Sequence, residues 1–83
     1  MTRHISSDMY KLPSELFSEL LFPKEVWTCG NTEVRVLKRF PQTVEHPHER
    51  AICGIRNPNT AERFVIRNCY IAGLKKCFEK IRG

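Results

Sequence analysis

The stretch EVWTCGNTEVRVLKRF, residues 25–40, is the part of the sequence that determines the predicted fold. Residues 25–29 and 32–40 are rich in types that favour strands, and Gly30-Asn31 separates them. A two-residue Gly-Asn connection between two such runs is typical of a tight β-hairpin. Pro41 ends the second run, because proline has no backbone N–H to donate to a neighbouring strand. The stretch therefore predicts two antiparallel strands at the centre of the molecule.

Two further strands are predicted on the C-terminal side of this hairpin. Residues 41–50 contain two prolines and two histidines and are predicted to form a connecting loop. Residues 51–56 and 62–67 have a strand-like composition, and the intervening Asn57-Pro58-Asn59-Thr60 is typical of a turn. Together with the hairpin, these segments predict an antiparallel sheet of three to four strands.

A short helix is predicted before the sheet, over residues 12–22. Pro13 suits the first helical turn, and Pro23 ends the helix because the residue before a proline is disfavoured in the helical conformation. The apolar residues of this segment form one stripe, which consists of Leu12, Leu16, Phe17, Leu20 and Leu21. A helix of this length is not stable alone, so we expect it to pack against the sheet.

The C-terminal tail predicts a second helix. Asn68 suits an N-cap, and a helix from there to Gly83 aligns four apolar side chains on one face. These four residues are Ile71, Leu74, Phe78 and Ile81. In the alternative interpretation the fourth strand continues to Ile71 and the helix starts near Gly73.

The predicted fold class is α+β. With 83 residues, 41% of them hydrophobic, the chain can form one small core. We predict a single domain over residues 12–83, in which the C-terminal helix packs on one face of the sheet. Residues 1–11 show no periodicity and predict a flexible N-terminal arm. The sequence has neither a run long enough to span a membrane nor an apolar secretory segment near its start, so a cytoplasmic protein is expected.

The charge of the chain is distributed unevenly. Residues 1–33 contain three basic and five acidic residues, a net charge of −2. Residues 34–83 contain eleven basic and four acidic residues, a net charge of +7. Because a partner responds to the local field rather than to the total charge, the second segment indicates a polyanionic partner, most often nucleic acid.

Arginines recur in the predicted strands at positions that share one face. Side chains alternate between the two faces of a strand, so the apolar residues of the three main strands predict one apolar face. That face consists of Val34, Val36, Ala51, Cys53, Ile55, Phe64 and Ile66. The opposite face contains Arg35, Arg39, Arg56, Arg63 and Arg67. Guanidinium groups suit phosphates and guanine edges, so this arginine face predicts a nucleic-acid-binding surface, assisted at phosphates by Lys75, Lys76 and Lys80.

A second interpretation of the same face is a protein-binding surface. Leu37, Ile52 and Val65 are predicted to lie among the arginines, and arginine beside apolar residues is common in protein interfaces. This interpretation predicts a small inhibitor or adaptor, of the kind that phages use to regulate a host machine. The acidic front end and the Leu/Phe stripe of the first helix could also recruit a second protein or form a homodimer.

The predicted topology resembles those of two classes of DNA-binding domain. A three-stranded sheet with a helix on its back is similar to the AP2-type domains and to the arm-site domains of tyrosine recombinases. Residues 56–64, RNPNTAERF, are similar to the turn between the last two strands of the recombinase class. The order of helix, strands and helix also resembles a double-stranded-RNA-binding domain, with Lys75-Lys76 near the start of the last helix. The first two resemblances imply a sheet that lies in a DNA groove, and no family is assigned.

The sequence contains no set of residues that predicts catalysis. Its three histidines lie in the arm and the loop, and it has neither a nucleophile motif nor a phosphate-binding glycine loop. His46 and His48 with Cys29 and Cys53 could in principle supply four metal ligands. The four cysteines, Cys29, Cys53, Cys69 and Cys77, lack Cys-x-x-Cys spacing and are predicted to be reduced. We therefore expect a non-enzymatic regulatory protein without metal or cofactor, which binds nucleic acid, DNA in preference to RNA.

Overall fold

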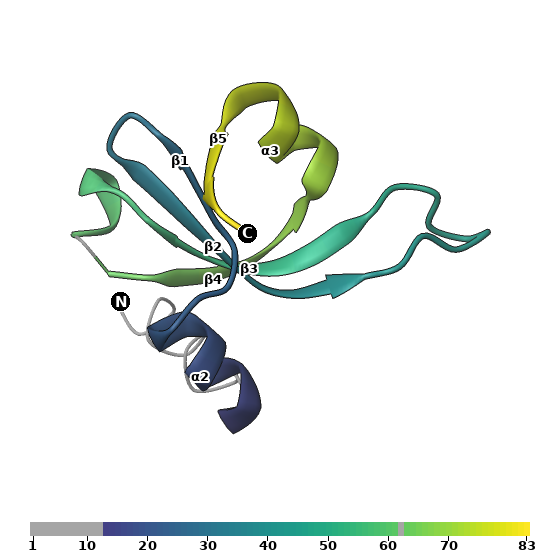
Figure 1. Cartoon of the computed structure of the whole chain (residues 1–83), viewed down its shortest axis with the longest axis horizontal. Coiled ribbons are helices and arrows are strands. Elements are labelled where there is room, and N and C mark those ends of the chain that lie inside the picture. The colour runs from purple at the N-terminus through teal and green to yellow at the C-terminus, as the bar shows by residue number, and fades with distance from the viewer. Residues whose placement is uncertain (1–12, 62) are drawn as a thin grey trace.

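A computed structural model of the protein describes residues 13–61 and 63–83, and the predicted arm over residues 1–11 lies outside them. In chain order the elements are α2 (Ser14–Leu21), β1 (Val26–Cys29), β2 (Thr32–Phe40), β3 (Arg50–Arg56), the short 3-10 helix η1 (Pro58–Thr60), β4 (Val65–Tyr70), α3 (Ile71–Cys77) and β5 (Glu79–Arg82) (Figure 1). The strands form one antiparallel sheet in the order β4-β3-β2-β1-β5. The predicted α+β class is confirmed, and the sheet in the described residues has five strands instead of three to four.

The predicted hairpin joins β1 to β2. Cys29 lies opposite Thr32 across the Gly30-Asn31 turn. Gly30 has a φ of +60°, a left-handed conformation that glycine adopts without steric cost. Where β2 continues alongside β3, the register shifts between Val36 and Lys38, so that Leu37 is an extra residue in β2. Such a β-bulge reverses the face on which every later side chain of the strand lies.

Helix α2 lies where the sequence predicts a helix. The Pro13 carbonyl accepts a hydrogen bond from the Leu16 N–H at 2.9 Å, and the Phe22 N–H donates to the Ser18 carbonyl at 2.9 Å. Leu16 and Leu20 are buried, whereas Phe17 and Leu21 of the predicted stripe are exposed. Leu12 lies outside the described residues. The buried stripe of α2 is therefore narrower than predicted.

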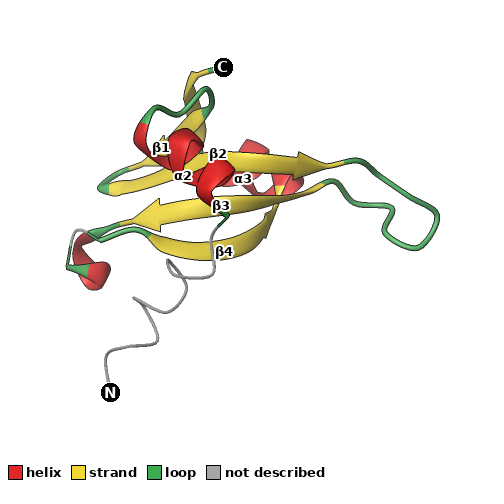
Figure 2. Cartoon of the chain, turned by 90° about the horizontal axis from the view of Figure 1, so that it is seen from below, coloured by secondary structure: helices red, strands yellow, loops and turns green. Residues whose placement is uncertain are grey.

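The two helices cover opposite faces of the sheet (Figures 1 and 2). On the face that we call the α3 face, one buried cluster consists of Trp27, Val34, Val36, Ala51, Cys53, Ile71 and Leu74. On the opposite α2 face, a second cluster consists of Leu16, Leu20 and Leu37, with Ile52, Phe64 and Ile66 packed against it. The sheet is thus the middle layer between a C-terminal helix, as predicted, and an N-terminal one.

The side chains of β4 lie on the faces opposite to those predicted. Val65 pairs with Ile55 and Arg67 pairs with Cys53, and paired residues of antiparallel strands share a face. Val65 and Arg67 therefore belong to the α3 face, whereas Phe64 and Ile66 belong to the α2 face. The prediction assumed a single helix-covered face, but α2 supplies a second apolar surface, and Phe64 and Ile66 pack against it.

The C-terminal tail forms a strand, a short helix and another strand. The prediction of one helix from Asn68 to Gly83 is wrong, and the alternative in which β4 continues to about Ile71 is closer. After Phe78 donates its N–H to the Leu74 carbonyl at 2.8 Å, the chain becomes extended and pairs with β1. This pairing satisfies the backbone hydrogen-bonding groups along the open edge of β1. A local sequence pattern cannot show that such an edge lies nearby. No helix in the described residues is long and apolar enough to cross a membrane.

Two cysteines are joined in the core, contrary to the expectation that all four are reduced. Cys53 of β3 and Cys69 of β4 form a disulfide. Cys69 lies opposite Ala51, so both cysteines point to the α3 face at diagonal positions of adjacent strands. Cys29 and Cys77 are free and exposed.

Helix α2 approaches the sheet at Gly54, where a side chain would not fit. A Cβ atom at this position would lie 2.6 Å from Cδ1 of Leu20 and 3.4 Å from Cδ1 of Phe64. We expect Gly54→Ala to lower the free energy of unfolding by about 1–3 kcal/mol, because Leu20 must move out of its packed position. Thermal unfolding followed by circular dichroism should show a fall in Tm of about 5–15 °C.

Gly73 provides the matched control for this substitution. A Cβ atom at Gly73 meets no atom within 4 Å, and the residue lies within α3. Because alanine favours a helix over glycine by up to about 1 kcal/mol, Gly73→Ala should leave the Tm unchanged or raise it. Equal Tm values for Gly54→Ala and the wild type would contradict close packing of α2 on the sheet.

Candidate nucleic-acid interface

Arg35 and Arg56 lie on the α2 face and share one carboxylate. Glu33 accepts a hydrogen bond from Nε of Arg35 at 2.8 Å and from Nη2 of Arg56 at 2.6 Å. Both guanidinium groups lie over the ring of Phe64, at 4.5 and 4.7 Å from its centre. Nη1 of Arg35 also donates to the Leu20 carbonyl at 2.6 Å, at the C-terminal end of α2. These two predicted binding residues therefore hold α2 and the strands together.

Arg39 lies on the α3 face, because the bulge at Leu37 reverses the alternation of β2. Its Nη2 atom lies 2.6 Å from Oε2 of Glu25, and its Nη1 atom lies 2.6 Å from Oε2 of Glu49. Glu25 also accepts a hydrogen bond from the indole N–H of Trp27 at 2.8 Å. Arg39 thus connects the starts of β1 and β3 across β2, and its charge is compensated within the protein.

The ion pairs change the acidity of their carboxylates. For Glu25, the hydrogen bond from Arg39 is the main cause that lowers the pKa, against a smaller opposing effect of burial. For Glu33, burial by itself would raise the pKa, but the hydrogen bonds and charges of Arg35 and Arg56 outweigh it and lower the pKa. A carboxylate whose pKa is lowered by folding stabilises the fold above its unfolded pKa, and this contribution is lost as pH falls through the folded value.

We expect Glu33→Gln to lower the free energy of unfolding by about 1–3 kcal/mol at pH 7, because it removes the charge that Arg35 and Arg56 share. This difference from the wild type should shrink as pH falls below 4.5, the ordinary pKa of the carboxylate. Urea unfolding at several pH values measures it. Glu45→Gln, in an exposed loop, is the control and should change little. A difference that stays constant with pH would contradict the ionised pairing.

The remaining two predicted arginines lie near the outer strand β4. Arg67 is exposed on the α3 face of β4, and Arg63 is exposed just before this strand. No ion pair joins either of them to another described residue. The structure therefore does not gather the five arginines on one face, and Arg63 and Arg67 are the two of the five that form no ion pair with a described residue.

The three predicted lysines lie on the same side of the sheet as Arg67. Strands β4 and β5 are the two edge strands of the sheet. Between them the chain crosses the α3 face by way of helix α3 (Figure 1). Lys75 and Lys76 are exposed in the last turn of α3. Lys80 pairs with Trp27 in the register and lies 5.6 Å from the centre of its indole ring. We call Arg67, Lys75, Lys76 and Lys80 the cationic surface.

The net charge of the protein is concentrated in the segment that builds this surface. Residues 63–83 contain six basic residues and one acidic residue, a net charge of +5. Residues 1–62 contain eight basic and eight acidic residues and are formally neutral. The entire formal net charge of +5 therefore belongs to the last 21 residues, whereas Arg35, Arg39 and Arg56 of β2 and β3 are paired with glutamates.

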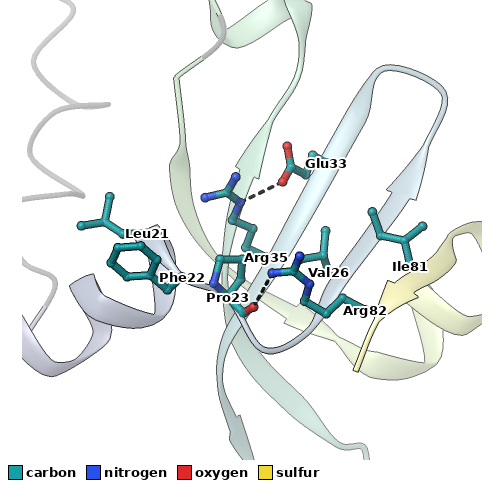
Figure 3. A pocket seen from close by; sticks show the side chains of 8 residues that line it. All are labelled: Leu21, Phe22, Pro23, Val26, Glu33, Arg35, Ile81 and Arg82. Carbon is teal, nitrogen blue, oxygen red and sulfur yellow. Dashed lines mark hydrogen bonds and ion pairs between the residues drawn. The ribbon is translucent and has the colours of Figure 1, made fainter.

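A groove of about 360 Å³ lies on the α2 face, between the end of α2 and β5 (Figure 3). Its lining consists of Leu21, Phe22, Pro23, Val26, Glu33, Arg35, Ile81 and Arg82. Nη1 of Arg82 donates to the Pro23 carbonyl at 3.2 Å, which connects the two sides of the groove. The lining combines apolar side chains with two guanidinium groups and one carboxylate, so it suits an apolar group that carries negative charge.

The sequence prediction missed this groove and the role of Arg82. Ile81 was expected on the buried face of a helix, but in β5 it is exposed and lines the groove. The segment Glu79-Lys80-Ile81-Arg82 contains a single apolar residue and no alternation, so its local pattern gives no signal for a strand. Of the cysteines considered as metal ligands, Cys53 is in the disulfide, and no group of three or more His, Cys, Asp or Glu side chains that could hold a metal ion lies in the described part of the chain.

Comparison with protein-family models, with curated protein sequences and with solved structures found no match to this chain. The assignment of a function therefore depends on the charges, contacts and shape described above.

Proposed function

We propose that the protein is a non-enzymatic regulator that binds nucleic acid through the cationic surface of the α3 face. The observation that carries this proposal is the location of the net charge, since residues 63–83 hold all of it. Arg67, Lys75, Lys76 and Lys80 are exposed, and they extend across the sheet from β4 to β5. A surface of this kind attracts phosphates and releases the counterions bound to them.

The chemistry of the cationic surface predicts weak dependence on base sequence. Arg35, Arg39 and Arg56 are held by glutamates, so the guanidinium forks that suit guanine edges are occupied. Three of the four residues of the cationic surface are lysines, which act mainly as point charges toward phosphates. Arg67 is the one side chain of this set that can form bidentate contacts. We propose DNA as the partner, held chiefly by its backbone.

The salt dependence of duplex binding tests this proposal. Fluorescence anisotropy with a labelled DNA duplex should show binding at about 50 mM salt and a steep loss toward about 200 mM. Four phosphate contacts predict a slope of about −3 to −4 in a plot of log affinity against log salt. A second duplex of unrelated sequence should bind within a few-fold of the first. Absence of binding at low salt, or a flat salt dependence, would overturn the proposal.

A further inference from the structure

Strand β5 ends the sheet at one edge. It pairs with β1 on one side, and no strand of the described residues pairs with its other side. All four of its residues are exposed. An edge strand presents backbone N–H and C=O groups in the spacing of a sheet, so it can accept an additional strand from another chain.

The α2 side of this edge carries exposed apolar side chains beside Arg82. Ile81 is 60% exposed, Leu21 is 63% exposed and Phe22 is 76% exposed, and all three line the groove shown in Figure 3. Single exposed apolar residues are ordinary, but three around one groove mark a surface that another molecule can cover. A side chain that an added strand directs to the α2 side would lie beside Ile81 and could enter this groove.

The α3 side of the same edge is basic. Lys80 lies on this side, beside Trp27, and α3 carries Lys75 and Lys76 in the turn that precedes β5. A side chain directed to this side would meet positive charge. Because side chains of a strand alternate between its faces, the edge favours a strand in which apolar and acidic residues alternate.

Strand β5 of a second copy of this chain lacks this alternation of apolar and acidic residues. In a symmetric antiparallel pair, a register centred on Glu79, Lys80 or Arg82 sets the residue opposite itself. A register centred on Ile81 is interrupted by the register shift of β5 at this residue, which leaves Lys80 and Arg82 on opposite sides of the sheet. The other three registers place like charges directly opposite each other, which is destabilising. The charge of β5 therefore favours an acidic partner over self-association.

We propose that β5 and the adjoining groove bind an extended segment of a partner protein in which apolar and acidic residues alternate. The segment adds a sixth strand to the sheet beside β5. Its apolar side chains contact Ile81 and the groove, and its carboxylates face Lys80. This docking site shares Lys80 with the cationic surface, whereas its apolar contacts at Ile81 and the groove lie on the α2 side, away from the proposed nucleic-acid contacts.

The test uses a labelled, capped hexapeptide of alternating Val and Glu, and the full chain. We expect anisotropy to show saturable binding, and NMR hydrogen exchange to show slowed exchange of amides within residues 79–82. A hexapeptide of alternating Val and Lys should bind at least about tenfold more weakly. The Val-Glu peptide with methylated backbone nitrogens should also lose about tenfold or more, because it cannot complete the ladder.

Substitutions in the protein separate this site from nonspecific attraction. Ile81→Ser should weaken peptide binding about fivefold or more through loss of apolar contact, and Val44→Ser, in an exposed loop, should not. Ile81→Ser should leave duplex DNA binding unchanged, so failure here is distinct from failure of the proposed function. Equal binding of the methylated peptide, or no effect of Ile81→Ser, would overturn the proposal. So would a dimer of the free protein that Ile81→Ser abolishes, because a second copy would then occupy the edge.

Discussion

Replacing Lys75 and Lys76 together by glutamate should lower the affinity for duplex DNA about a hundredfold at about 0.1 M salt. Each lost phosphate contact removes the release of roughly one counterion, which at this salt concentration corresponds to about a tenfold loss. Both side chains are exposed in the last turn of α3, so the substitutions should leave the fold intact. Anisotropy with the wild-type duplex measures the change, and the slope of log affinity against log salt should become smaller by about two.

A control of identical charge distinguishes the cationic surface from the total charge of the protein. Lys24→Glu with Lys38→Glu also lowers the formal net charge by four from +5. Lys38 lies on the α2 face, opposite Ile52, and Lys24 precedes β1. We expect this control to bind DNA within about threefold of the wild type, since Lys24 pairs with Glu19 and Lys38 lies on the face opposite the proposed contacts. Equal losses for the two double variants would show that only the total charge matters.

Arg35→Ala should lower the free energy of unfolding by about 2–4 kcal/mol, because Arg35 is partly buried and holds α2 to the sheet. The substitution removes hydrogen bonds to the Glu33 carboxylate and to the Leu20 carbonyl, and the contact with the Phe64 ring. Hydrogen bonds to charged groups contribute about 1.5–3 kcal/mol, and a cation–π contact adds about 0.5–2 kcal/mol. Thermal unfolding should show a Tm lowered by about 10–20 °C.

Arg67→Ala is the matched control for this result. Arg67 is exposed on the α3 face and has no ion pair with a described residue. Its replacement should change the free energy of unfolding by no more than about 0.5 kcal/mol, while the affinity for DNA falls about tenfold. A loss of stability in Arg67→Ala as large as that in Arg35→Ala would mean that Arg67 is structural. A neutral Arg35→Ala would contradict its role in holding α2.

Local patterns predicted much of the fold. Short-range preferences predict the helix before Pro23, the Gly30-Asn31 turn and the two strands that this turn joins. The structure contains all of these elements. The end of the chain could not be predicted in the same way. Residues 79–82 join the sheet because β1 has an open edge at that position, and the period of the sequence carries no information about an edge. Trp27 packs with Ile71 and Leu74 of α3, because the face on which it lies depends on the pairing of β1.

The candidate site was predicted in part. Lys75, Lys76, Lys80 and Arg67 were identified as binding residues, and they remain candidates because they are exposed on one side of the sheet. Arg35, Arg39 and Arg56 were selected by their residue type and spacing. Each of them is bound by a glutamate, and in three of these pairs the partner lies 10, 14 or 23 positions away in the sequence. A pattern of alternation contains nothing that assigns such partners.

The sequence by itself determined the α+β class, the central hairpin and the excess of positive charge toward the C-terminus. The tertiary structure decided which face each of these arginines occupies and which of their charges are paired with glutamates. The physical reason is that strand side chains alternate with a period of two, so a displacement of one residue moves a side chain to the other face. Leu37 makes that displacement in β2, and the packing of Phe64 and Ile66 against α2 sets the faces of β4.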